Sequence, residues 1–316
     1  MHQYLQAVRE VLEKGARKEN RTGVDTLSTF NVNYEIDLAF GFPLLTTKEV
    51  SWKNIVVENL WFLSGDPHIE ILHRHGCKFW DPWADETGKV PSAYGHFWRH
   101  FPVQLGPGPL DNTNDQLTWM LNELRRNPMS RRLVVSAWAP SNAQTSALPP
   151  CHALWVLNVQ NTPTIECAGR LGPNGQNLHA GTVLTTEQRL CLHLTQRSCD
   201  IALGVPYNIA GYAFILSVFS HLSGIAPGIF AHTLIDAHAY TCKPDGSMAD
   251  YDHVPGLREQ LGRTPRELPR LTISPTIREL SDIEAVIRDA STTEVLELFK
   301  LEGYDPHPPI KFKVAV

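Results

Sequence analysis

The segment Asn54–Leu63 constrains the fold more than any other part of the chain, because it is apolar on almost every side. If it is a helix, only Glu58 and Asn59 offer polar side chains, and neighbouring elements have to bury most of its surface. Ile209–Leu222 is a second apolar segment that is long enough for a buried helix. Two such helices require a large core, and 316 residues of which 42% are hydrophobic can build one.

Strand and helix patterns follow one another along the rest of the chain without a regular alternation. Apolar residues recur at helical spacing up to Leu12, and Gly15 supplies a stop. They recur again over residues 114–126, where Pro128 ends the predicted helix. Strand patterns occur at residues 24–38 (as a strand pair), Leu133–Ala139, Ala153–Val159, Leu190–Gln196, Ile229–Tyr240 and, as a strand or extended tail, Ile310–Val316. This mixture predicts an α+β fold.

Two polar stretches stand between these segments. Residues 160–187 are rich in glycine and asparagine, which predicts an extended loop or insertion. Residues 243–275 carry prolines and predict a surface loop with a short helix. Since the sequence has no repeat and no long linker, we expect a single domain over residues 1–316 with an insertion at about 160–187.

Charge and cysteine content exclude several classes of function. Lys and Arg number 28 against 33 Asp and Glu, and this net charge of −5 argues against a general nucleic-acid binder. No apolar run is long enough to cross a bilayer, and the first residues do not resemble a secretion signal. The six cysteines lack CxxC spacing, so we expect no metal site and no disulfide scaffold, and a cytoplasmic location.

Cys151 is a candidate nucleophile because of its neighbours in LPPCHA. Pro149 and Pro150 restrict the backbone at the entrance of a predicted strand, and His152 follows directly. A thiol becomes nucleophilic when cationic groups lower its pKa. The alternative is that Cys151 is simply a small buried apolar residue.

Arginines supply such cationic groups. Arg131 and Arg132 precede a predicted strand, Arg197 lies beside Ser198, and Arg21 lies in a turn-like segment. Each arginine alone is typical of a solvated surface. Together, guanidinium groups and a serine hydroxyl are what a phosphate monoester requires.

Glu58 is unusual because of its place in an apolar segment. A buried carboxylate has a raised pKa and can serve as a general acid or base near neutral pH. The equally supported alternative is a narrow exposed strip made of Glu58 and Asn59.

Aromatic residues are dense between residues 79 and 101, where Trp80, Trp83, Tyr94 and Trp98 occur. Such a cluster can belong to the core, but it also suits stacking against a flat heterocycle.

In their order along the chain, these motifs and their neighbours resemble the folate-dependent thymidylate synthase family. The matching motifs are NRTG (20–23), GFPLLTTK (41–48), WFLSGD (61–66), FWDPWADETG (79–88), YGHFWR (94–99), SRRLVVSAW (130–138), LPPCHA (148–153), QRSCDIALGVPYNIAGYA (196–213), DAHAY (236–240) and EGYDPHPPIK (302–311). The resemblance implies an α+β fold with a large bent mixed sheet covered by helices. It also implies a homodimer in which the sheets of two subunits pack back to back. The substrates implied are dUMP and 5,10-methylenetetrahydrofolate, and the products are dTMP and dihydrofolate.

The resemblance also implies a role for each matching residue. The catalytic residues are Cys151, as the nucleophile that adds to C6 of the base, and Glu58, Tyr94 and His152, as a proton-transfer network. The nucleotide-binding residues are Arg21, Arg131, Arg132, Arg197, Ser198, Asp200, Asn208, His238 and Tyr240, with Arg131 and Arg132 donated by the other subunit. The folate-binding residues are Trp80, Trp83, Asp200, Leu203, Gly204, Tyr207 and Val316.

Some positions depart from the family pattern and leave related reactions open. Asn59 replaces an apolar residue, Gly211 a serine, Tyr207 a phenylalanine, and Phe312–Lys313 an alanine–proline pair. If Asn59 and Gly211 admit water to the site, the product is a hydroxymethyl nucleotide instead of a methylated one. The alternatives are therefore a dUMP or dCMP hydroxymethylase and a dCMP methyltransferase. Asn208 favours uracil, although an amide that can rotate also pairs with cytosine.

Two hypotheses from other classes have less support. A noncatalytic nucleotide- or RNA-binding protein has no use for the thiol of Cys151. A cysteine hydrolase built on Cys151 and His152 needs an oxyanion hole and an orienting acid, and the sequence around them contains neither signature.

Overall fold

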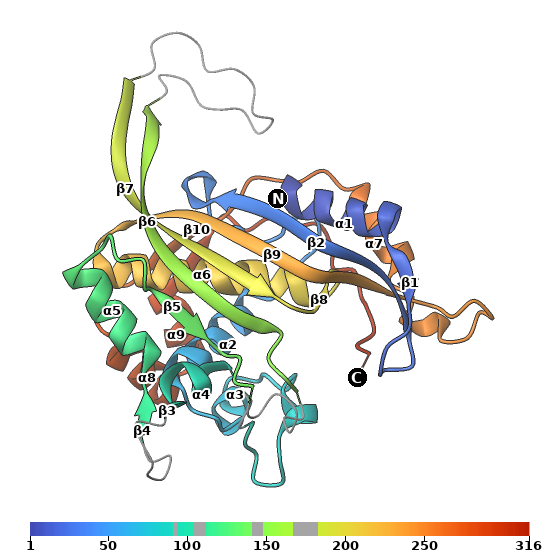
Figure 1. Ribbon diagram of the computed structural model, residues 1–316, viewed down its shortest axis with the longest axis horizontal. Helices are drawn as coiled ribbons and strands as arrows, with labels where there is room; N and C mark the ends of the chain where they lie inside the picture. The colour runs from blue at the N-terminus through green and yellow to red at the C-terminus, as the bar shows by residue number, and fades with distance from the viewer. Residues whose placement is uncertain (91–93, 104–111, 141–147, 167–182, 316) are drawn as a thin grey trace.

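The computed structural model describes residues 1–90, 94–103, 112–140, 148–166 and 183–315 (Figure 1). Within these residues the strands are β1 (Ala16–Lys18), β2 (Asp25–Asp37), β3 (Phe101–Val103), β4 (Asn112–Asn114), β5 (Val134–Ser136), β6 (His152–Glu166), β7 (Val183–Gln196), β8 (Cys199–Asp200), β9 (Ala226–Thr241), β10 (Arg270–Ile273) and β11 (Phe299–Glu302). The α-helices are α1 (His2–Lys14), α2 (Trp52–Ser64), α3 (Glu70–Arg74), α4 (Tyr94–Arg99), α5 (Gln116–Arg126), α6 (Gly204–Ser223), α7 (Val254–Leu261), α8 (Leu280–Asp289) and α9 (Thr292–Leu298). Short 3-10 helices are η1 (Leu38–Phe40), η2 (Asp81–Trp83) and η3 (Ala249–Tyr251).

A mixed sheet of seven strands is the centre of the described structure. Its order is β1-β2-β9-β7-β6-β5, and β8 pairs with β9. Strand β9 runs antiparallel to β2 and parallel to β7, whereas β6 runs antiparallel to both β7 and β5. Because β7 and β9 are parallel, the chain has to cross over between them, and α6 lies in that crossover (Figure 1). The predicted α+β fold with a large mixed sheet is confirmed.

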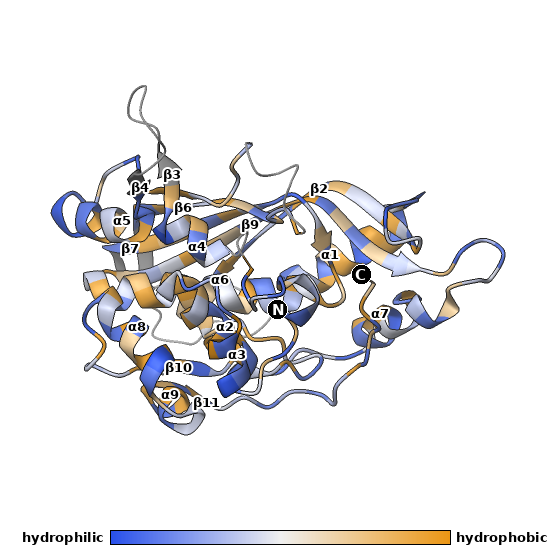
Figure 2. Ribbon diagram, turned by 90° about the horizontal axis from the view of Figure 1, so that it is seen from below, coloured by the Kyte–Doolittle hydropathy of each residue, from blue (hydrophilic) through white to orange (hydrophobic). Residues whose placement is uncertain are grey.

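Helices form a layer on one face of this sheet, where α2, α6 and α8 lie below it in Figure 2. Helix α6 is buried along almost its whole length, and Phe214 and Phe219 are fully inaccessible to solvent. Helix α2 buries Leu60 and Trp61 to the same degree. Both helices that the sequence predicts to be buried are therefore confirmed.

The ends of α2 follow from its flanking residues. The Ser51 hydroxyl accepts a hydrogen bond from the N–H of Asn54 at 3.3 Å, which caps the first turn. Gly65 ends the helix in the left-handed conformation, with φ of 75°, which glycine adopts without strain. These caps place Glu58 and Asn59 in the middle of the helix.

Two predictions about individual segments are wrong, and a third is decided between its two alternatives. Residues 24–38 contain one long strand, β2, instead of a strand pair, and its register skips Asn31, which has a φ of 61°. Residues 310–315 form no strand, so of the two alternatives for this segment the strand is excluded and the tail is not. The prediction of a loop over 160–187 fails at both ends, because β6 continues to Glu166 and β7 begins at Val183. The physical reason is that β-branched residues flank the glycine-rich centre and favour pairing.

The extended ends of β6 and β7 form an antiparallel arm that projects beyond the sheet (Figure 1). Their pairing continues from Asn161 opposite Gln188 to Glu166 opposite Val183. Residues 167–182, the centre of the predicted insertion, lie outside the described residues.

Candidate active site

Cys151 lies just before β6, where its backbone is held from two sides. Its N–H donates a hydrogen bond to the hydroxyl oxygen of Tyr94 at 3.0 Å, and its carbonyl accepts one from the N–H of Arg197 at 2.8 Å. The Arg197 guanidinium donates to the carbonyl of Pro150 at 2.9 Å and to that of Pro149 at 2.7 Å. Arg197 therefore fixes the turn that presents the thiol.

The electrostatic surroundings of the thiol act in opposite directions. Burial raises the pKa of Cys151, whereas the charges of Arg197 and Arg21 and the hydroxyls of Tyr94 and Ser198 lower it. The balance leaves the pKa above its ordinary value. These four groups nevertheless surround the thiol and reduce the cost of forming a thiolate.

His152 stacks on Tyr94, with ring centroids 4.4 Å apart and planes 12° apart. Burial lowers the pKa of His152 to about 3, and hydrogen bonding to Asn208 only partly opposes this. The imidazole is therefore neutral at physiological pH, and it supplies no positive charge to the thiol. A group this weakly basic is also a poor general base, which argues against a Cys151–His152 hydrolase.

Glu58 is bound by one of the clustered tryptophans. The indole N–H of Trp80 donates a hydrogen bond to its Oε1 at 2.8 Å. Burial raises the pKa of Glu58 to about 7, although the Trp80 N–H lowers it in part. The Trp80 ring in turn contacts the ring edges of Trp83 and Tyr94, with centroids 5.7 and 6.2 Å away. Glu58 can therefore both donate and accept a proton near neutral pH.

Asn59 and Gly211, the two residues that depart from the family pattern at these positions, lie against each other. A Cβ atom added to Gly211 would stand 2.9 Å from Nδ2 and 3.1 Å from Oδ1 of Asn59. Asn59 is 3% exposed and its Nδ2 donates to the carbonyl of Ile55 at 2.8 Å. The Asn59 amide thus fills the space that a side chain at position 211 would take, so the two departures compensate each other.

One partly exposed face of α6 and the turn before it carry the next group of predicted residues, which are Leu203, Gly204, Tyr207 and Asn208. Asp200 holds the start of this helix, because its Oδ1 accepts from the N–H groups of Ala202 and Leu203 at 2.9 and 3.2 Å. Burial opposes ionisation of Asp200, but His253, whose Nδ1 is 3.8 Å away, His238 and the N–H of Leu203 together outweigh it, and the pKa is lowered. Asp200 is therefore an ionised acceptor beside this face.

Gln196 is a residue of this group that the sequence analysis did not single out. Its Nε2 donates to Oδ1 of Asn208 and to the carbonyl of Ser198, both at 3.0 Å. Gln196 is 3% exposed and follows Leu194 at the next inward position of β7. A polar residue in a row of buried apolar ones was the available signal, since it has to find a partner inside the protein.

Of the remaining predicted residues, His238 and Tyr240 contact each other, whereas Arg131 and Arg132 are exposed to solvent. The His238 ring contacts the Tyr240 ring edge with centroids 5.4 Å apart, and burial together with Asp200 raises the pKa of Tyr240 to about 12. In contrast, Arg131 and Arg132 are exposed and take part in no ion pair among the described residues. Val316 lies outside the described residues.

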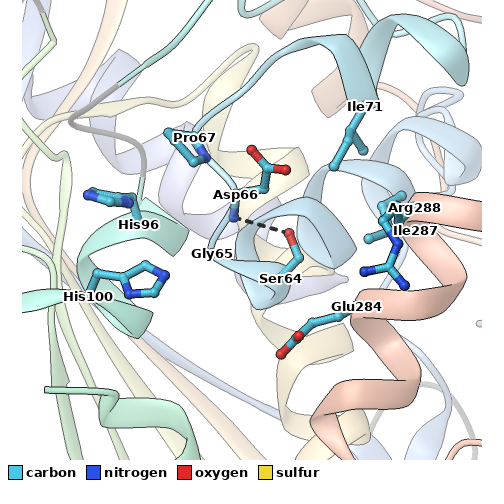
Figure 3. A pocket seen from close by; sticks show the side chains of 10 residues that line it. All are labelled: Ser64, Gly65, Asp66, Pro67, Ile71, His96, His100, Glu284, Ile287 and Arg288. Carbon is cyan, nitrogen blue, oxygen red and sulfur yellow. Dashed lines mark hydrogen bonds between the residues drawn. The ribbon is translucent and has the colours of Figure 1, made fainter. Parts of the chain in front are cut away.

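A cavity of about 410 Å³ opens at the far end of α2 (Figure 3). His96 and His100 line one side, Glu284 and Arg288 of α8 line the other, and Asp66 lies between them. None of the predicted site residues lines this cavity, so it is separate from the group around Cys151.

No cluster of metal-ligating side chains occurs in the part of the chain that the structure describes. Five cysteines in that part are free thiols. Among the described residues, no helix has the length and hydropathy needed to cross a membrane.

Comparison with protein families gives one match over nearly the whole sequence. The family model described as thymidylate synthase matches residues 2–316. The match includes all the site residues discussed above and extends well beyond the motifs around Cys151.

Proposed function

The chain belongs to the thymidylate synthase family, whose members transfer a one-carbon unit from folate to C5 of a pyrimidine nucleotide, and we propose that this member converts dUMP to dTMP. The observation that carries the proposal is the set of contacts around Tyr94. Its hydroxyl binds the backbone of the thiol-bearing Cys151, its ring stacks on His152, and Trp80 links it to Glu58. A nucleophile and a neutral-pH acid–base group therefore share one aromatic cluster.

In the proposed reaction the Cys151 sulfur forms a bond to C6 of the uracil ring. The C5–C6 π electrons move onto C5 and O4, so C5 becomes a carbon nucleophile. When bound, 5,10-methylenetetrahydrofolate supplies the one-carbon unit and the hydride. Loss of the C5 proton to a base would release the folate nitrogen from the transferred carbon, and hydride addition to that carbon would then re-form the ring double bond as the sulfur–C6 bond breaks.

Glu58 is the group that we assign to proton movement. With a pKa of about 7 it is present in both protonation states near neutral pH. Burial raises the pKa of Tyr94 well above its ordinary value, so its hydroxyl keeps its proton and acts as a hydrogen-bonding group. This difference supports separate roles, in which Glu58 exchanges protons and Tyr94 positions the reacting groups.

The residues present suit a reduced folate as the second substrate. Trp83 is half-buried and offers aromatic surface to a flat heterocycle, and the buried Trp80 ring packs against it with centroids 5.7 Å apart. Asp200 is ionised and can accept hydrogen bonds from ring N–H groups. Leu203 and Tyr207 stand partly exposed on the adjoining helix face. Asp200 also lies close enough to His238 and Tyr240 to border the nucleotide.

The compensating pair at Asn59 and Gly211 supports methylation over hydroxymethylation. The opening that a glycine would leave in α6 is filled by the Asn59 amide, so these departures give no reason to expect extra water at the site. The nucleotide monophosphate is assigned to Arg21, Arg197 and Ser198, and the sugar 3′-hydroxyl to His238 and Tyr240.

We further propose that the chain acts as a homodimer in which Arg131 and Arg132 reach the site of the partner subunit. Both are exposed and take part in no ion pair among the described residues. The face of the sheet opposite α6 carries half-buried apolar residues such as Val156 and Ile229, and Phe30 is 80% exposed. A second copy would cover this surface, and its arginines would further favour the Cys151 thiolate.

The test is product identification with dUMP and dCMP in parallel, each with the methylene folate. Mass spectrometry of the nucleotide and the absorbance of dihydrofolate report the two products. dTMP and dihydrofolate from dUMP support the proposal. A hydroxymethyl nucleotide with tetrahydrofolate, or a reaction of dCMP alone, would overturn it in favour of the corresponding relative.

A further inference from the structure

A line of hydrogen bonds crosses the sheet below the predicted base-binding amide. The Tyr34 hydroxyl is 2.7 Å from Nδ1 of His232, and Nε2 of His232 is 3.0 Å from Oε1 of Gln196. Nε2 of Gln196 is 3.0 Å from Oδ1 of Asn208. Tyr34 and His232 are directly paired residues of β2 and β9, and His232 is only 1% exposed. Neither residue belongs to the predicted site.

A backbone carbonyl gives this line a direction. Nε2 of Gln196 also donates to the carbonyl of Ser198, and a carbonyl can only accept. The NH₂ group of Gln196 therefore faces Asn208, and its oxygen faces His232. His232 must then carry its proton on Nε2 and accept from the Tyr34 hydroxyl at Nδ1, and Asn208 must turn its oxygen towards Gln196.

Burial is consistent with this arrangement of protons. Desolvation lowers the pKa of His232 well below its ordinary value, so the ring is neutral. A neutral imidazole has one donor and one acceptor, which is what the line requires at this position. The Gln196 oxygen requires this tautomer, because it can only accept from Nε2, and the Tyr34 hydroxyl stabilises it by donating to Nδ1.

We propose that Tyr34 and His232 are positioning residues for base selection, because they help to hold the Asn208 amide in one orientation. The inference rests on the proposed function, in which Asn208 pairs with the base. Uracil presents a donor at N3 and an acceptor at O4, whereas cytosine presents an acceptor at N3 and a donor at N4. A given orientation of the amide therefore fits one base, and a rotated amide would place two NH₂ groups, those of Asn208 and Gln196, against each other.

The test measures binding, since binding does not depend on folate or on turnover. Equilibrium constants for dUMP and dCMP are determined by calorimetry for the wild-type protein and for the variants His232→Gln and Tyr34→Phe. The glutamine can present either a donor or an acceptor to Gln196, and the phenylalanine removes the donor to Nδ1 that stabilises the Nε2–H tautomer of His232. We expect the dUMP-to-dCMP affinity ratio to fall by roughly fivefold in His232→Gln and by about threefold in Tyr34→Phe, as for the partial loss of one hydrogen bond.

Tyr304→Phe is the matched control. The Tyr304 hydroxyl also makes two hydrogen bonds, to the carbonyl of Leu45 at 2.8 Å and from the N–H of Val50 at 2.9 Å, but it is not part of the line. Its loss should lower the melting temperature and leave the affinity ratio unchanged. If His232→Gln does not fold, Tyr34→Phe decides, because it removes a single hydroxyl.

The outcomes separate the inference from the proposed function. An unchanged ratio in a folded Tyr34→Phe variant overturns the inference and leaves the function intact. A wild-type protein that prefers dCMP overturns the proposed substrate, and the inference then holds if the variants weaken that preference. A protein that binds neither nucleotide overturns both.

Discussion

The two ends of the proposed nucleotide site differ in how complete they are within one chain. At the base end, Asn208 is bound by Gln196, and Cys151 is held by Tyr94 and Arg197. At the phosphate end, Arg131 and Arg132 lie exposed, with no ion-pair partner among the described residues. Activity at the base end should therefore be lost when a residue of the same chain is changed. Phosphate binding should instead depend on the arginines of a second copy of the chain.

The largest effect is expected at the base end, from Cys151→Ser. A serine hydroxyl is a far weaker nucleophile than a thiolate, so turnover of dUMP should fall by more than about a thousandfold. The Tyr94 bond to the backbone of residue 151 does not involve the thiol, so the dissociation constant for dUMP should change little. Fixed-time assays measure turnover, and calorimetry measures the dissociation constant for dUMP. Turnover within tenfold of wild type would contradict the role assigned to Cys151.

The phosphate end should show a large effect that a partner subunit can repair. The double variant Arg131→Glu, Arg132→Glu should lose roughly a hundredfold in activity, because two cations are replaced by anions near a phosphate. Mixed with Cys151→Ser under exchange conditions, it should recover about a quarter of wild-type activity, since half of the dimers then contain one intact site. No recovery on mixing would mean that these arginines serve their own chain or no site at all.

The sequence predicted the residues at the base end better than the contacts that hold them in place. The apolar surroundings of Glu58 left a buried carboxylate and an exposed polar strip equally open, and burial raises its pKa to about 7. Gln196 and His232 were missed because each is one polar residue at an inward strand position, and their importance appears only when three strands lie side by side. The contact between Asn59 and Gly211 joins α2 to α6 across about 150 residues of sequence, a distance that local patterns do not span.

The extended arm shows the opposite error, in which local composition was given too much weight. Glycine and asparagine in the centre of 160–187 suggested a loop throughout. The flanking residues instead continue β6 and β7 as an antiparallel pair, because each strand supplies the other's hydrogen bonds. Composition averaged over a window hides such a change from strand to loop.

Glu58→Gln tests whether the base end contains the proton-exchanging group. The amide still accepts from Trp80 but does not titrate, so activity should fall roughly a hundredfold and the inflection of the rate near pH 7 should disappear. The pH dependence of stability tests the same group independently of activity. Burial raises the pKa of Glu58 to about 7 in the folded protein, from 4.5. The wild-type free energy of unfolding should therefore decrease as the pH rises through this range, and the variant should lack that decrease. A variant with an unchanged pH profile would assign the inflection to another group.

The smallest expected effect concerns the packing behind the base end, where Gly211 lies against Asn59. Alanine normally stabilises a helix interior by about 1 kcal/mol relative to glycine, but here its Cβ would meet Nδ2 of Asn59 at 2.9 Å. Gly211→Ala alone should therefore lower the free energy of unfolding by roughly 1 kcal/mol, as overpacking does. In an Asn59→Ala background the same substitution should raise it, because the clash is gone and the helix propensity remains. Chemical denaturation of the four proteins measures this reversal of sign as a coupling energy. If Gly211→Ala stabilises both backgrounds equally, the two departures are independent, and the space above Gly211 is not filled by Asn59 in solution.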